Sequence, residues 1–166
     1  MRRVSILLLF MLLLLSGCSK GDIQKDISEN IEIDVNKGTV LTEADSHGGF
    51  HGDGITMTQI SFDDGTVLDA IENNDHWNRV PLSKNITALV YGIDEETSSI
   101  GPYLTDENGN TIIPEIQNGY YYFYDRHSES KDPYSDEDVL GRASFNFTLA
   151  LYDSDNNVLY YVEFDT

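Results

Sequence analysis

The C-terminal quarter of the chain carries the pattern that most constrains the fold. Apolar side chains occupy every second position from Ala143 to Leu151 and again from Val158 to Phe164, and a polar run at 153–157 separates the two stretches. A period of two is typical of a half-buried β-strand, and two such strands joined by a short polar turn favour an antiparallel hairpin. The sequence therefore predicts a sheet with one buried face at this end of the chain.

Other segments favour more strands and a single helix. Strands are expected at 31–35, 55–62, 86–93 and 120–124, a hairpin at 102–113, and a short helix at 64–73. A change of phase within 55–62 predicts a bulge in that strand or a change in the face to which its apolar side chains point. The expected fold class is mainly β or α+β, an antiparallel β sandwich-like domain with one short helix.

The N-terminus has the order of a secretory signal. Arg2 and Arg3 precede an apolar run of twelve residues from Val4 to Leu15, which is shorter than the roughly 20 residues that a membrane-spanning helix needs. The end of this run, Leu15-Ser16-Gly17-Cys18, resembles the lipobox of bacterial lipoprotein precursors. The resemblance implies that residues 1–17 are a signal peptide that is cleaved, and that Cys18 becomes the lipidated first residue.

Lipidation would place the protein at the cell membrane, lipid-anchored on its extracytoplasmic face. Membrane lipid is then a partner through acylated Cys18, and two or more acyl chains such as palmitate hold a protein more firmly than one. The polar residues 18–30 are expected to form a lipidated flexible tether, and 31–166 a single mostly antiparallel β domain. Because Cys18 is the one cysteine of the chain, the domain has no disulfide and must be stabilised by its core.

The charge of the chain restricts its partners. The formal net charge is −19, and loss of Arg2 and Arg3 with the signal leaves 8 basic against 29 acidic side chains, or −21. Phosphate backbones are bound by Lys and Arg, so nucleic acid is excluded as a partner. The acidity serves solubility, or it attracts a cationic partner such as an envelope protein or peptide, or divalent ions.

A glycine-rich loop at 45–54 gathers the first candidate site. Asp45, His47, His51 and Asp53 are residue types that bind zinc and related ions, and the surrounding glycines would allow them to converge. The spacing matches no established metal motif, and the alternative is a loop in which the histidines bond to backbone and hold the bend. Binding of a divalent metal by these four residues is one hypothesis for this loop.

Two further places hold possible chemistry. Arg126 and His127 follow the aromatic run 120–124, where His127 could act as a general base or lie solvated beside an Arg126 ion pair. The aromatic run itself predicts core packing on both faces, or an aromatic platform for a ligand on one of them. The sequence thus favours a non-enzymatic binding or interaction domain at the cell surface, with a metal-assisted hydrolase that uses the His47 and His51 loop as the alternative.

Overall fold

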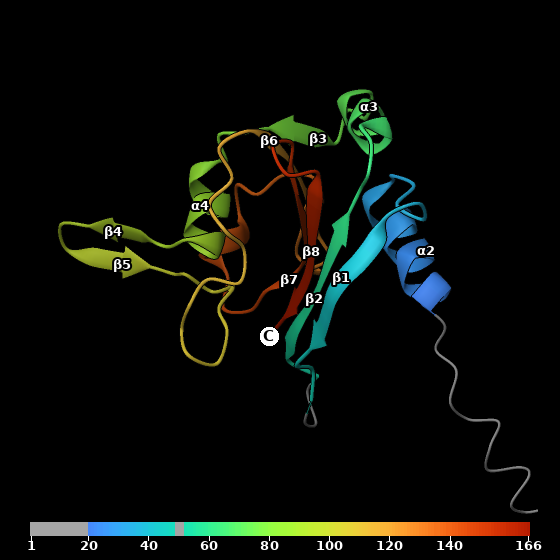
Figure 1. Cartoon of the computed structure of the whole chain (residues 1–166). Coiled ribbons are helices and arrows are strands. Elements are labelled where there is room, and N and C mark those ends of the chain that lie inside the picture. Colours follow the sequence, from blue (N-terminus) through green and yellow to red (C-terminus); the bar gives the residue numbers. More distant parts are fainter. Residues whose placement is uncertain (1–19, 49–51) are drawn as a thin grey trace, which may run out of the picture.

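The computed structural model describes residues 20–48 and 52–166. It shows an antiparallel sheet with helices on both faces (Figure 1). The six strands lie in the order β1-β2-β8-β7-β6-β3, and β4 and β5 form a separate two-stranded sheet. The prediction of a mainly β or α+β fold is confirmed. The strands are β1 (Thr39–Asp45), β2 (Gly54–Ser61), β3 (Trp77–Arg79), β4 (Ile93–Glu95), β5 (Ser98–Ile100), β6 (Gly119–Asp125), β7 (Asn146–Asp153) and β8 (Val158–Asp165).

The C-terminal hairpin forms as predicted, from β7 and β8 with Phe147 opposite Phe164. Its burial differs from the expectation, because β7 is buried at every position after Asn146. The two strands lie between β2 and β6, and both of their faces are covered because residues of each strand belong to both hydrophobic cores. Ala150 packs on one side of the sheet and Leu149 on the other.

The predicted tether at 18–30 is wrong for the part that the structure describes. Lys20–Ile31 form a helix, α2, in which Ile27 is 2% and Ile31 0% exposed. Isoleucines at positions 23, 27 and 31 recur every four residues and so share one face of the helix, which packs on the sheet. The folded domain therefore begins before residue 31, and the strand expected at 31–35 is instead the helix end followed by a turn.

The strand expected at 86–93 is also wrong, since Lys84–Val90 form helix α4. Ser83 caps this helix, because its side chain accepts a hydrogen bond from the backbone N–H of Ile86. A short apolar run does not distinguish a buried strand from a buried helix, and here the capping serine decides. The helix expected at 64–73 is present as α3 (Thr66–Glu72), and Val139–Gly141 form a short 3-10 helix.

Two smaller expectations are decided by the pairing of the strands. The phase change within 55–62 is a change of face and not a bulge: β2 pairs regularly with β8, Ile55 and Met57 belong to one core, and Ile60 belongs to the other. A bulge that the sequence did not predict lies in β1, between Val40 and Thr42. The hairpin expected at 102–113 is reduced to one bridge between Thr105 and Thr111. In the ranges 20–48 and 52–166, none of the helices is both long and apolar enough to span a membrane.

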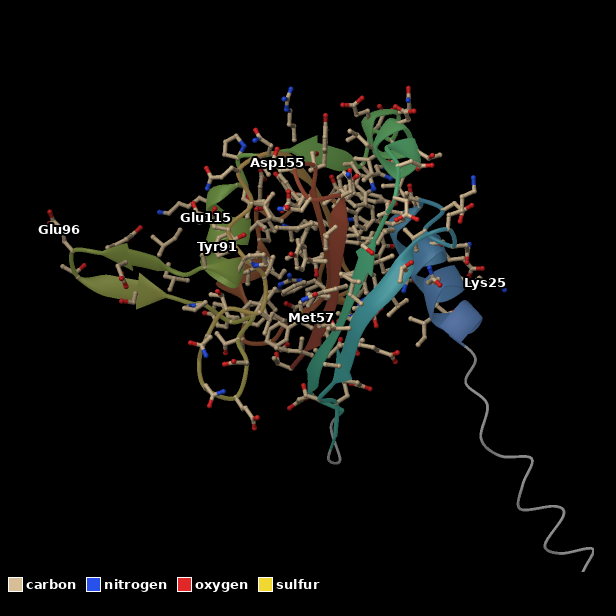
Figure 2. The ribbon with its side chains drawn as sticks, viewed as in Figure 1. Lys25, Met57, Tyr91, Glu96, Glu115 and Asp155 are labelled. Atoms are coloured by element: carbon tan, nitrogen blue, oxygen red, sulfur yellow. The ribbon has the colours of Figure 1, made fainter. Side chains whose placement is uncertain are left out.

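The sheet separates two cores. Helices α2 and α3 pack on one face, around Trp77 and Tyr122, and α4 packs on the other, around Phe123 and Phe147. Figure 1 shows α2 and α4 on opposite sides of the sheet, with the β4–β5 hairpin projecting beyond α4. In Figure 2 Met57 of β2 lies on the α4 side, and Lys25 points away from the sheet on the outer surface of α2.

Strand pairing brings distant polar residues to one end of the sheet. β8 ends at Asp165, which lies opposite Asn146 at the start of β7 and opposite Gly54 at the start of β2. β1 ends at Asp45 beside Thr56 of β2. Residues that are far apart in the sequence, Asp45, Asn146 and Asp165, therefore lie at the same end of the sheet.

Candidate functional site

A network of charged side chains centres on His47 at this end of the sheet. Nδ1 of His47 lies 2.7 Å from Oδ1 of Asp45, and Nε2 lies 3.2 Å from Oδ2 of Asp165. Nη2 of Arg126 donates to the same Asp165 oxygen at 3.0 Å, and Asn146 donates to the other oxygen at 2.9 Å. The network thus links the ends of β1, β6, β7 and β8.

The surroundings of His47 favour its charged form. Partial burial acts to lower the pKa of His47, but the carboxylates of Asp45 and Asp165 outweigh it and raise the pKa above the usual 6.5. Burial also acts to raise the pKa of Asp165, and the hydrogen bonds from Arg126 and Asn146 reverse this and lower it. The backbone N–H of His47 is the main cause of the lowered pKa of Asp45.

This arrangement bears on the hypothesis of a metal site. Each ring nitrogen of His47 contacts a carboxylate on a different side of the ring, so Asp45 and Asp165 do not converge on one point. Asp53 is exposed, and His51 lies outside the described residues. Among residues 20–48 and 52–166, no group of three or more His, Cys, Asp or Glu side chains is arranged to hold a metal ion.

Arg126 joins the His47 network, whereas His127 makes its contacts elsewhere. Nε2 of His127 lies 3.1 Å from the hydroxyl of Ser144, and Nδ1 accepts a hydrogen bond from the backbone N–H of Glu129 at 3.2 Å. Because Nδ1 is an acceptor, Nε2 carries the proton and donates to Ser144. His127 is half-buried and fixes the loop after β6, which differs from the solvated side chain expected in the second of the two roles, whereas Arg126 does form an ion pair, with Asp165.

A buried ion pair lies beneath the same loop. Nη2 of Arg142 is 2.8 Å from Oδ2 of Asp125, and the two side chains are 9% and 3% exposed. Oδ1 of Asp125 accepts from the backbone N–H of His127. The nitrogens of the Arg142 guanidinium find no well-directed hydrogen-bond partner among the described residues, so the contact with Asp125 is mainly ionic.

A tyrosine-lined depression lies on the α2 side of the sheet, and we call it the tyrosine hollow. Its volume is about 260 Å³. Strand β6 supplies Tyr122 and Tyr124, and the loop before β7 supplies Tyr134, whose ring centre is 5.2 Å from that of Tyr124. The hollow is lined by Glu29, Asn30, Glu32, Tyr122, Tyr124, Arg126, Tyr134 and Thr148.

Glu32 holds one wall of the tyrosine hollow in place. The hydroxyl of Tyr134 donates to Oε1 of Glu32 at 2.7 Å, and Nδ1 of His76 lies 2.8 Å from Oε2. The imidazole of His76 stacks on Tyr134 with ring centres 3.6 Å apart. The hydrogen bond from Tyr134 is the main cause of the lowered pKa of Glu32, and the same bond raises the pKa of Tyr134 to about 12.

Sequence reasoning identified part of this arrangement. Asp45, His47 and Arg126 were candidates, and the run 120–124 was expected to pack on both faces, which Tyr122 and Phe123 do. Asp165, Glu32 and the other partners were missed, since nothing in their local sequence distinguishes them from the many other acidic or aromatic residues.

Comparisons with known proteins give no relative: no family model, no curated protein and no solved structure matches this chain. The function must therefore be argued from the residues themselves.

Proposed function

We propose that this chain is the precursor of a lipid-anchored bacterial lipoprotein whose domain binds a cationic partner without catalysis. The lipobox resemblance at Leu15-Ser16-Gly17-Cys18 supports the anchor. In this proposal residues 1–17 are removed and acylated Cys18 holds the protein on the extracytoplasmic face of the cell membrane. Helix α2 begins at Lys20, so about 7 Å of chain at most separates the folded domain from the lipidated residue.

The tyrosine hollow is the observation that carries the binding role. It combines the rings of Tyr124 and Tyr134 with the carboxylates of Glu29 and Glu32. One face of Tyr134 is covered by His76, and Arg126, the cation in the lining, is already paired with Asp165. Aromatic faces and carboxylates both attract ammonium and guanidinium groups. The large negative charge of the chain acts in the same direction at longer range. An envelope protein or peptide that presents an arginine or lysine side chain fits this site.

The geometry of His47 favours binding over a metal-assisted hydrolase. A catalytic metal needs several ligands that face one point and leave an open position. His47 instead bridges Asp45 and Asp165 and ties the ends of the strands together. We therefore assign His47 a structural role beside the site.

The anchor is tested at Cys18. The Cys18→Ser variant should fail to incorporate radiolabelled palmitate and should accumulate as an uncleaved precursor. In a lipobox the cysteine sulfur is the atom to which the diacylglycerol is attached, and serine lacks it. Ser19→Ala, next in the chain, is the matched control and should mature normally. Normal maturation and labelling of Cys18→Ser would refute the lipoprotein assignment.

The tyrosine hollow is tested with N-acetyl-arginine amide, a small cation that cannot pair along a strand. We expect binding in the millimolar range, followed by NMR shifts of the tyrosine ring signals, and the neutral isostere N-acetyl-citrulline amide should bind at least about fivefold more weakly. Glu32→Gln keeps an acceptor for Tyr134 and removes the charge, so it should cause a similar loss. Glu96→Gln, at the exposed tip of the β4–β5 hairpin, is the control for net charge (Figure 2). Equal binding of the arginine and citrulline compounds would rule out this site.

A further inference from the structure

Strand β1 leaves one edge of the sheet open. Within residues 20–48 and 52–166 it pairs with β2 alone, six of its seven residues are exposed, and Leu41 at its bulge is 52% exposed. The hydrogen bond from the backbone N–H of Ser46 to the Ile55 carbonyl shows that the backbone of Ser46 faces β2. The alternation of an antiparallel pair then directs the backbone N–H and C=O of Glu43 and Asp45 away from β2, where another strand could bind them.

On the α2 side of β1 lies a depression with a volume of about 160 Å³, which we call the acidic hollow. Asp26, Glu43 and Glu163 line it, and Ile23 and Ile27 of α2 form an apolar wall. Thr58 also lines the hollow, and its side-chain hydroxyl finds no hydrogen-bond partner among the described residues although the residue is 1% exposed. An unpaired buried hydroxyl beside carboxylates is suited to an ammonium or guanidinium donor on an aliphatic stem.

On the α4 side of β1 lies a second depression of about 360 Å³, which we call the apolar hollow. Ala44 of β1, Ile55 and Met57 of β2, and Ile112 form its apolar surface. Asp45, Asp106 and Glu107 lie at the same hollow and add negative charge at its rim. In Figure 2 the side of the sheet that carries Met57 faces the loop that contains these residues.

We propose that β1 binds an extended segment of a partner protein by strand addition, and that this segment alternates basic and apolar side chains. Consecutive residues Glu43 and Ala44 belong to different hollows on opposite faces of the sheet. An added strand also sends successive side chains to opposite faces, so its basic residues enter the acidic hollow and its apolar residues the apolar one. Its backbone pairs with Glu43 and Asp45.

Charge selects such a partner over a second copy of this chain. Pairing β1 with another β1 would bring the carboxylates of Glu43 and Asp45 near those of the other molecule, and like charges across a strand pair are unfavourable. A basic segment would instead place positive side chains beside the carboxylates of Glu43 and Asp45, which is favourable. The proposal extends the binding role to a surface that adjoins the tyrosine hollow, with Asn30 in the lining of both. Their charged groups differ, since Glu32 lines the tyrosine hollow and Glu43 the acidic hollow, so either role can fail alone.

The test uses a fluorescent ten-residue peptide of alternating lysine and valine, with binding to the purified protein followed by anisotropy. We expect saturable binding, and a peptide of the same composition with lysines and valines in separate blocks should bind about tenfold more weakly. N-methylation of alternate backbone amides on the pairing edge should cause a similar loss, because it removes the strand hydrogen bonds. Equal binding of all three peptides would overturn the proposal.

Variants assign the peptide to β1. Glu43→Gln should weaken binding about two- to fivefold, and Ala44→Lys, which places a cation at the apolar hollow, should weaken it further. Glu96→Gln should have no effect. Glu32→Gln tests the tyrosine hollow and should leave peptide binding unchanged, which separates this proposal from the preceding one. If sedimentation instead shows a dimer that the peptide does not dissociate, a second copy occupies β1 and the proposal is wrong.

Discussion

Ile31→Ala should lower the free energy of unfolding by about 2–5 kcal/mol, the range for removing a large buried aliphatic side chain. Ile31 is 0% exposed at the end of α2, and its carbonyl accepts the indole hydrogen bond of Trp77 at 3.1 Å. The cavity would open between α2 and the sheet, beside Tyr122. Urea unfolding followed by tryptophan fluorescence measures the change, since Trp77 is the one tryptophan in the chain.

Lys25→Ala is the matched control on the same helix. Its side chain is 69% exposed and its ion pair with Glu29 spans 3.7 Å in water, so we expect a change within about 0.5 kcal/mol. If Ile31→Ala were as neutral as Lys25→Ala, residues 20–31 would behave as the tether that their polar composition suggests, and the packing of α2 would be refuted.

Arg142→Met should lower the free energy of unfolding by about 3–5 kcal/mol, because it leaves the carboxylate of Asp125 buried without a compensating charge. Asp125 is 3% exposed and Arg142 is its ion-pair partner in the described part of the chain. Methionine has nearly the length of the arginine stem, so the loss reflects charge more than volume. The same urea unfolding experiment measures it.

The double variant Asp125→Asn, Arg142→Met separates the two effects. Asparagine keeps an oxygen that can accept from the backbone N–H of His127 and removes the buried charge. The double variant should therefore be more stable than Arg142→Met alone, a non-additivity of about 1–3 kcal/mol between residues in direct contact. Additive losses would mean that Arg142 contributes through packing and not through its charge.

The two α-helices that the sequence did not predict, α2 and α4, both depend on contacts outside their own residues. Residues 20–31 are polar except for isoleucines at every fourth position, and 86–90 are a short apolar run, so neither pattern specifies a helix by itself. α2 is stabilised because Ile27 and Ile31 pack on the sheet, and α4 is stabilised because Ser83 caps it. Local patterns of this length are decided by what the rest of the chain offers them.

The candidate site divides in the same way. The sequence pointed to Asp45 and His47 because imidazole and carboxylate groups bind metal ions, and to Arg126 because it stands beside a candidate general base, His127. It could not point to Asp165, which lies 118 residues from His47 in the chain and meets it through strand pairing. The tyrosine hollow likewise needs Glu32 and Tyr134, which are 102 residues apart.

The sequence by itself determined the antiparallel C-terminal hairpin, the mainly β class and the strongly negative charge, because these depend on local periodicity and on composition. The tertiary structure alone decided that β7 is buried on both faces, that α2 belongs to the core, and that His47 bridges two carboxylates. Those features depend on contacts between residues far apart in the chain, and such contacts form only when the strand order β1-β2-β8-β7-β6-β3 brings the strand ends together.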